Sequence, residues 1–121
     1  MDIMAVGMGG FVGAVLRYLI GLVPIRESAV FPIKTFVINV IGCAAIGIIT
    51  ILASKNPNIN PRWILFLKVG ICGGFTTFST FALEATDLVK NGYMGIAFLY
   101  VILSIFTGVV VIFGTEMAIG K

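Results

Sequence analysis

The sequence predicts an all-α integral membrane protein with four transmembrane helices, and three observations support this fold class. First, 60% of the 121 residues are hydrophobic and 11% are charged, with a mean hydropathy of +1.16, whereas soluble domains are about half apolar and about a quarter charged. Second, four apolar stretches follow one another between short polar segments. Third, four helical crossings need about 80 residues, which leaves about 40 for loops and ends. We expect a single membrane domain, residues 1–121, embedded in the lipid bilayer.

The first two predicted spans are separated by prolines. The first covers residues 4–23, contains Arg17 as its only charge, and ends at Pro24, which cannot continue a helix. The second covers residues 34–53 and is free of charge after its first residue. Polar residues and Pro57 follow it, so we expect a turn there.

The third predicted span covers residues 63–89 and is broken in its middle, at 73–77. A glycine pair at 73–74 weakens the helix, and four hydroxyls follow among the five residues 76–80. Because threonine caps helix N-termini well, we expect a new half-helix to begin near Thr76 or Thr77, with free N–H groups at its positive end. Exposed carbonyls would lie just before it. A break of this kind can bind an ion inside the membrane.

The fourth predicted span covers residues 92–115 and carries no charge. Its length suffices to cross a bilayer with some tilt. Two GxxxG spacings occur elsewhere, at Gly9 to Gly13 and at Gly70 to Gly74. Glycines at this spacing let helix backbones approach closely, so we expect tight helix packing at both places.

An aromatic stripe follows the predicted break. Phe75, Phe78 and Phe81 recur three residues apart, roughly on one helical face, and Thr77 and Thr80 lie between them. Such a stripe is commonly packing. A phenyl ring also has a positive edge, so rings interleaved with hydroxyl donors could accompany a small anion without trapping it. Both interpretations stay open on this pattern alone.

Other polar residues within the spans are candidates for function or for helix packing. Asn39 is a lone amide in the second span, able to line a pore or to hydrogen-bond a neighbouring helix. Arg17 could draw anions toward an entrance or extend to the membrane surface. Glu84 is a functional candidate because acids at that depth are rare. A weaker hydroxyl stripe occupies one face of the fourth span, formed by Tyr100, Ser104 and Thr107.

The composition argues against several classes of protein. The chain has no histidine, and no nucleophile–base pair is evident, so we do not expect an enzyme. The eight basic residues are scattered, so we expect no nucleic-acid partner. Cys43 and Cys72 lie in apolar stretches and are interpreted as small buried hydrophobic residues. No organic cofactor is expected.

The distribution of charge predicts insertion in both orientations. With four spans, and with cations inside the membrane counted at their nearer ends, both sides of the membrane carry four cations. Positive residues therefore favour neither orientation. We expect an antiparallel homodimer, with a weakly biased fixed topology as the alternative. The two sets are Lys55, Arg62, Lys68 and Lys121 on one side, and Arg17, Arg26, Lys34 and Lys90 on the other.

Three segments resemble the Fluc/CrcB family of fluoride ion channels. They read GGFVGAVLRY at residues 9–18, TFVINVIG at 35–42, and GICGGFTTFSTF at 70–81, followed by Glu84. The third segment is the most specific, and the likeness runs in order through nearly the whole chain. The fourth span matches least well, since Gly108 stands where a further hydroxyl is expected.

The resemblance implies a dual-topology homodimer in the cell membrane, the inner membrane of a prokaryote, that exports toxic fluoride passively through two pores. It also implies a structural sodium ion at the dimer interface, bound by the backbone carbonyls of Gly73 and Thr76. By the same likeness, Phe78 and Phe81 would present ring edges to fluoride, and Asn39 would be a donor in the pore. The rest of the implied fluoride pathway comprises Ser79 and Thr80 as nearby hydroxyls, Tyr100 and Ser104 on the fourth span, and Arg17 at an entrance.

Two other functions fit a small membrane protein. A dual-topology, proton-coupled multidrug exporter would need an acid in its substrate chamber, and Glu84 is the only candidate. A non-conducting membrane subunit would use the same polar residues to bind a partner. Fluoride conduction is the function that the sequence favours.

Overall fold

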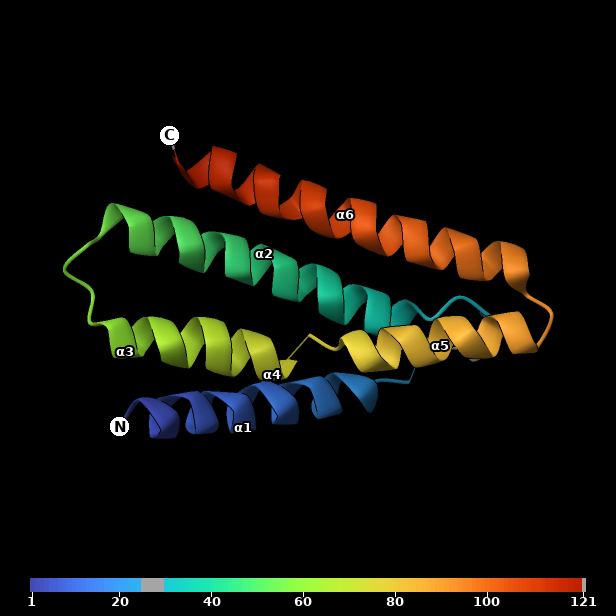
Figure 1. Ribbon diagram of the computed structural model, residues 1–121, viewed down its shortest axis with the longest axis horizontal. Coiled ribbons are helices and arrows are strands. Elements are labelled where there is room, and N and C mark those ends of the chain that lie inside the picture. The colour runs from blue at the N-terminus through green and yellow to red at the C-terminus, as the bar shows by residue number, and fades with distance from the viewer. Residues whose placement is uncertain (25–29, 121) are drawn as a thin grey trace.

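A computed structural model describes residues 1–24 and 30–120, and this part of the chain is helical throughout, apart from its connections. Arg26, Glu27 and Lys121, which belong to the predicted first loop and to the charge count, lie outside the described residues. Four segments are long and apolar enough to cross a membrane. They lie side by side along the molecule (Figure 1). The predicted four-helix membrane fold is therefore confirmed.

Three of the four segments are single helices, and the third is divided. The single helices are α1 (Asp2–Gly21), α2 (Ile33–Lys55) and α6 (Met94–Gly120). The third segment contains α3 (Pro61–Ile64), η1 (Leu65–Cys72), α4 (Gly73–Phe75) and α5 (Phe78–Lys90). Of these, η1 is a π-helix, with the wider i→i+5 hydrogen-bond pattern.

The break in the third segment falls at Thr76 and Thr77, not at the glycine pair. Both threonines have extended backbone, with φ −118° and ψ 121° at Thr76 and φ −125° and ψ 110° at Thr77. Gly73 and Gly74 remain helical, so the expectation that the glycine pair itself breaks the helix is wrong. The physical reason is packing: a Cβ at Gly74 would lie 2.9 Å from the Cα of Gly10 on α1, so this glycine permits close contact between helices.

The GxxxG spacings produce the close contact expected of them. α1 packs along η1 and α4. A Cβ on Gly9 would lie 2.8 Å from the Cα of Gly70, and one on Gly13 would lie 2.6 Å from the amide nitrogen of Phe75. The two backbones therefore touch where a larger residue could not fit, which confirms the predicted tight packing.

On the other side of the molecule, α2 packs against α6, and α6 also packs against α5. The second contact contains a small cluster of buried residues, Leu88, Ala97 and Tyr100, with Phe81 packed against it. The part of the third segment that follows the break, α5, therefore packs against α6.

Lysine side chains cap the C-terminal ends of neighbouring helices. Lys34 Nζ, at the start of α2, donates to the carbonyl of Gly21 on α1 at 2.8 Å. Lys55 Nζ, at the end of α2, donates to the carbonyl of Ile119 on α6. A cation suits both positions because the C-terminus of a helix carries partial negative charge.

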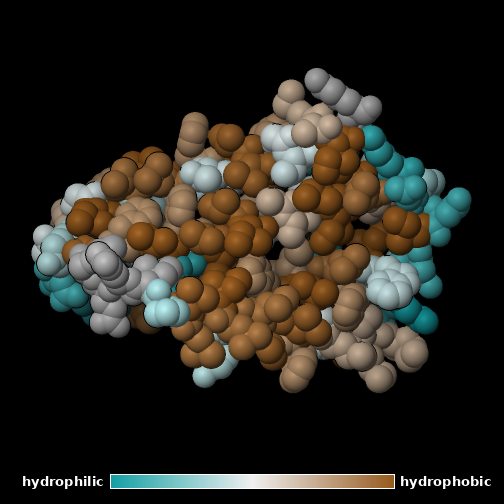
Figure 2. All heavy atoms as spheres, turned by 180° about the vertical axis from the view of Figure 1, so that it is seen from behind, coloured by the Kyte–Doolittle hydropathy of each residue, from teal (hydrophilic) through white to brown (hydrophobic). Residues whose placement is uncertain are grey.

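The surface is that of a protein in a bilayer. Between 11% and 17% of the residues in each spanning window are buried, and many large apolar side chains face outward. Figure 2 shows apolar residues over the middle of one face and hydrophilic residues gathered toward its ends. Lipid tails stabilise such a belt, so the chain is a multi-pass membrane protein.

Candidate functional site

The break creates the N-terminus of a half-helix within the third segment. Thr77 is the N-cap of α5, and its Oγ1 accepts a hydrogen bond from the Thr80 amide at 3.2 Å. This confirms the predicted cap. On the other side of the break, Thr76 Oγ1 donates to the carbonyl of Cys72 at 2.9 Å. The two hydroxyls thus bind to opposite half-helices, and the extended backbone between them is open to other partners.

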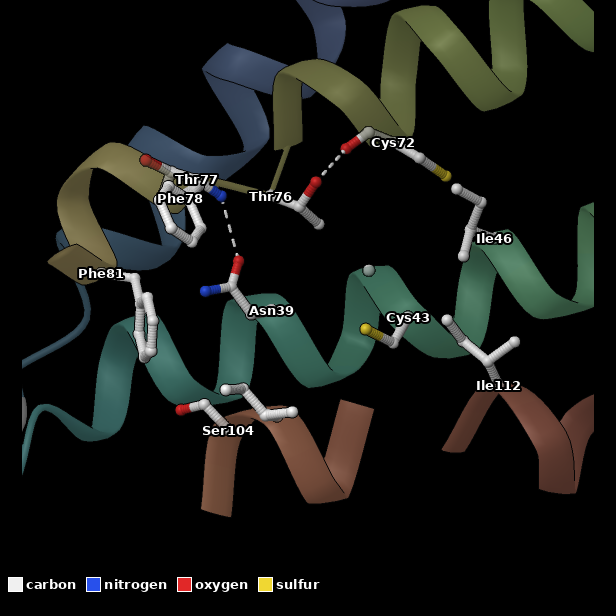
Figure 3. Close-up of a pocket in the computed structure, with 12 residues that line it drawn as sticks. Asn39, Cys43, Ile46, Cys72, Thr76, Thr77, Phe78, Phe81, Ser104 and Ile112 are labelled. Carbon is white, nitrogen blue, oxygen red and sulfur yellow. Dashed lines mark hydrogen bonds between the residues drawn. The ribbon is translucent and has the colours of Figure 1, made fainter. Parts of the chain in front are cut away.

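Asn39 on α2 supplies one of those partners. Its Oδ1 accepts a hydrogen bond from the Thr77 amide at 3.0 Å (Figure 3). In an unbroken α-helix, that amide would donate to the carbonyl of Gly73. Asn39 therefore replaces a helix carbonyl and anchors the break to α2. Its amide nitrogen, on the side of Phe81 in Figure 3, donates no hydrogen bond within the described residues.

The break opens into a pocket of about 440 Å³ beside α2 and α6. Amide, hydroxyl and aromatic groups line one part of it, and apolar groups line the other. In the described part of the chain, no charged side chain lines this pocket. The polar and aromatic lining consists of Asn39, Thr76, Thr77, Phe78, Phe81 and Ser104, and the apolar lining of Gly42, Cys43, Ile46, Cys72, Ile105 and Ile112.

Two phenylalanine side chains lie one after the other between the protein surface and its interior. The Phe78 side chain is 79% exposed, and its ring centroid lies 5.9 Å from that of the half-buried Phe81. The Phe81 ring in turn lies 5.0 Å from the ring of Tyr100, which is completely buried. Phe78, Phe81 and Tyr100 therefore form a chain of rings from an open face to the interior, whereas Phe75, the first member of the predicted stripe, is buried on α4 and does not line the pocket.

Beyond these rings lies a second group of polar side chains. Glu84 lies beside Thr35 and Tyr100, which come from α2 and α6. Three buried oxygens have no hydrogen-bond partner among the described residues: Glu84 Oε1, Tyr100 Oη and Ser104 Oγ. Unpartnered oxygens are costly in a membrane interior, so this group is suited to binding water or an ion with hydrogen bonds.

The other residues singled out in the sequence lie around this site. Ser79 is exposed, and Thr80, which binds the Thr77 cap through its amide, is half-buried; neither lines the pocket. Gly73 is exposed on α4, three residues before Thr76. Arg17 is half-buried on α1, a helix that contributes no lining residue.

Several residues of the site were not identified from the sequence, among them Thr35, Cys43 and Cys72. Thr35 lies four residues before Asn39, on the same face of α2, which was the available signal. Cys43 and Cys72, interpreted as buried apolar residues, also line the pocket. Both cysteines reach the pocket only because α2 and η1 pack around it, and the residues next to them in the sequence do not indicate this packing.

Comparison with known proteins extends the likeness over all four helices. Residues 4–115 match the family model described as CrcB-like protein, Camphor Resistance (CrcB). A protein of Azobacteroides pseudotrichonymphae named fluoride-specific ion channel FluC is 40% identical over 107 residues, 88% of this chain and 86% of the relative. Proteins with the same name are 46% identical over 115 residues in Ruminiclostridium cellulolyticum (91% and 88%) and 34% identical over 122 residues in Agrobacterium fabrum (100% and 97%).

Proposed function

This chain belongs to the CrcB-like protein family, and on that premise we propose that it is a fluoride-selective ion channel of the cell membrane. Relatives that match nearly its whole length are named fluoride-specific ion channels. The match covers all four helices, and we propose that residues 1–121 act as one membrane domain. It acts as a channel, without an enzymatic reaction.

The observation that carries this proposal is the uncharged pocket at the broken helix. Fluoride is small and strongly hydrated, so hydrogen-bond donors must replace its water when it enters a membrane. The Asn39 amide and the Ser104 hydroxyl are such donors, and the Phe78 and Phe81 rings offer positive edges. No lysine or arginine lines the described pocket. An anion there is held weakly enough to leave, as conduction requires.

The pathway we propose runs from the open pocket past Phe78 and Phe81 to Tyr100 and Ser104. The ring contacts of 5.9 and 5.0 Å and the buried hydroxyls support this direction. Glu84 lies beside the Thr35 and Tyr100 hydroxyls, where its side chain would contribute as a hydrogen-bond acceptor at the inner end of the path. The remaining proposed contributors are Ser79 and Thr80 as hydroxyls near the path and Arg17 as a cation near an entrance.

We also propose that two copies assemble as an antiparallel homodimer. The pocket is open on one side, and Phe78 is 79% exposed there. A second copy would cover this face and enclose the path. The tie in positive charge between the two sides of the membrane allows both orientations to be made.

A structural sodium ion would fit the break between the half-helices. The Thr77 amide donates to Asn39, so the Gly73 carbonyl lacks its usual helical donor. Within the described residues, no backbone hydrogen bond reaches the Thr76 carbonyl. Carbonyl oxygens suit hard cations. We propose that the Gly73 and Thr76 carbonyls of both subunits hold the ion, whose charge would fix the extended backbone of the two breaks.

Passive export follows from the charge of the anion. Hydrogen fluoride crosses bilayers as the neutral acid and dissociates in the more alkaline cytoplasm, which traps fluoride there. A membrane potential that is negative inside then drives the anion out, with about 2.3 kcal/mol per 100 mV for each charge. A selective leak is therefore sufficient to protect the cell.

Fluoride efflux from liposomes that contain the purified protein tests the proposal. Valinomycin sets the potassium-driven potential, a fluoride electrode follows release, and chloride is the comparison anion. We expect rapid fluoride release that depends on potential, with far slower chloride release. No release from verified folded dimers would contradict the channel function and favour the exporter or the partner subunit.

A further inference from the structure

The third segment carries a lysine that the pathway above does not use. Lys68 lies on η1, within the membrane-spanning part of the chain, and is half-buried. Neither an ion pair nor a hydrogen bond of its side chain is found among the described residues. A cation at this depth is costly, and cations so placed often mark ion pathways.

Helix geometry places Lys68 on the face of η1 that looks toward the pocket. Gly70 faces α1, since a Cβ there would lie 2.8 Å from the Cα of Gly9. Lys68 and Cys72 stand two residues before and after Gly70, so both lie on the opposite side of the helix. Cys72 is 4% exposed and lines the pocket. Lys68 is therefore one turn beyond the pocket lining, toward α3.

Among the described side chains at this end of the pocket, the other charges cancel and the charge of Lys68 does not. Glu116 on α6 stands one turn beyond the lining residue Ile112, and Lys55 ends α2 nearby (Figure 1). These two carry opposite charges. Asp2 and Arg62, also at this end, pair with each other at 3.5 Å. Among these described side chains, one lysine, one acid and one ion pair sum to zero, and Lys68 adds one positive charge.

We propose that Lys68 collects anions at the α3 end of the pocket and raises the local fluoride concentration before the anion reaches the uncharged lining. Its position outside that lining matters. A lysine inside the pocket would hold the anion, whereas one at the mouth attracts it and leaves it free to move on. This role rests on the proposed fluoride conduction. It places an anion-attracting cation on η1, in addition to Arg17, which lies on α1.

The test compares Lys68→Gln and Lys68→Arg in the liposome assay at two ionic strengths. The Debye length falls from about 30 Å at 0.01 M to about 3 Å at 1 M, so attraction to the lysine acts mainly at low salt. At 0.01 M we expect Lys68→Gln to lower the initial fluoride efflux roughly threefold or more, a modest case of electrostatic steering. At 1 M its rate should match the wild-type rate, and Lys68→Arg should match at both salts.

Lys90→Gln is the matched control, because Lys90 is exposed at the far end of α5 and lies outside the pocket. It should leave the rate unchanged at both ionic strengths. The proposal is overturned if Lys68→Gln equals the wild type at low salt, which would mean that the lysine only extends to the membrane surface. It is also overturned if glutamine and arginine slow efflux equally at both salts, as a packing role would.

Fluorine NMR of fluoride added to the protein separates this inference from the channel function. We expect wild-type protein to broaden the fluoride signal at low salt and Lys68→Gln to broaden it less. If the wild type broadens the signal more than Lys68→Gln does but conducts no fluoride, the channel proposal is contradicted and the anion-attracting role of Lys68 is retained. Equal broadening by both proteins would overturn the role of Lys68, whether or not the channel conducts.

Discussion

At the break, single side chains accept the backbone hydrogen bonds that backbone carbonyls accept in a regular helix. Asn39 Oδ1 accepts the Thr77 amide in place of a helix carbonyl, and Thr77 Oγ1 accepts the Thr80 amide. Both bonds satisfy donors that have no water within a bilayer. The break is therefore a bonded structure, fixed in place beside an open pocket.

Replacing Asn39 should affect both stability and conduction. Asn39→Ala leaves the Thr77 amide without its acceptor, which costs about 1–3 kcal/mol when the donor is buried. We expect a lower unfolding free energy in detergent and about tenfold slower fluoride efflux, equivalent to about 1.4 kcal/mol in the barrier. Asn56→Ala is the control, since that amide is exposed at the end of α2. Unchanged efflux by Asn39→Ala would contradict the pore role.

A substitution of Phe81 distinguishes a role of its ring in the fluoride path from a role in helix packing. Phe81→Ile keeps an apolar side chain and removes the ring edge, so efflux should fall about tenfold, or about 1.4 kcal/mol in the barrier, while the dimer persists. Size-exclusion chromatography checks the dimer. Phe11→Ile on the exposed face of α1 should change neither quantity. Loss of the dimer before any loss of efflux would instead assign Phe81 to packing.

At this scale the sequence predicts the chemistry of single residues better than their contacts. Asn39, Phe78, Phe81 and Ser104 each stood out as polar or aromatic residues in apolar spans, and the structure gathers them around one pocket. The bond from Thr77 to Asn39 joins residues 38 positions apart. That bond depends on the docking of two helices, which no local pattern encodes.

At the scale of elements, the third segment combines a wide helix, a close helix contact and a break within 30 residues. Its existence and its interruption follow from an apolar stretch that contains glycines and hydroxyls. The start of the second half-helix at Thr77 also follows, from the threonine cap, whereas the helical state of Gly73 and Gly74 does not, because glycine serves two purposes in membrane helices. Gly74 permits contact with Gly10, while the extended backbone falls on the β-branched Thr76 and Thr77.

The contact between α1 and η1 can be tested with one pair of variants. In Gly9→Ala the added methyl group would meet the carbonyl of Phe66 and the Cα of Gly70, so the helices must separate. We expect a loss of about 1–3 kcal/mol in unfolding free energy, as for other overpacked contacts. Gly7→Ala has open space around it and should be neutral or slightly stabilising. Equal stabilities in chemical denaturation would contradict this packing.

At the scale of the whole molecule, one copy leaves its main pocket open and most of its apolar side chains outside. Composition and span length predict the membrane fold because each crossing must satisfy its own backbone hydrogen bonds. They do not predict which face would bind a second copy in the proposed dimer, since both faces are apolar. The balance of positive charge predicts insertion in both orientations and leaves that face unassigned.

Dual topology is testable with an added C-terminal cysteine and a membrane-impermeant maleimide. We expect about half of the copies to be labelled from each side, because the cations on the two sides balance. Lys34→Gln removes a cation from one side and should shift the C-terminus toward the cytoplasm, whereas Arg62→Gln should shift it the other way. Labelling of every wild-type copy from one side would contradict the antiparallel dimer.

The reversal potential of the current across a planar bilayer tests fluoride-selective conduction most directly. With a tenfold fluoride gradient and equal chloride on the two sides, a fluoride channel should reverse near 59 mV, about the potential of a tenfold gradient of a monovalent ion. The sign should follow the fluoride gradient and be insensitive to a pH gradient. A reversal potential near zero, or one that follows the proton gradient, would contradict a fluoride-selective channel.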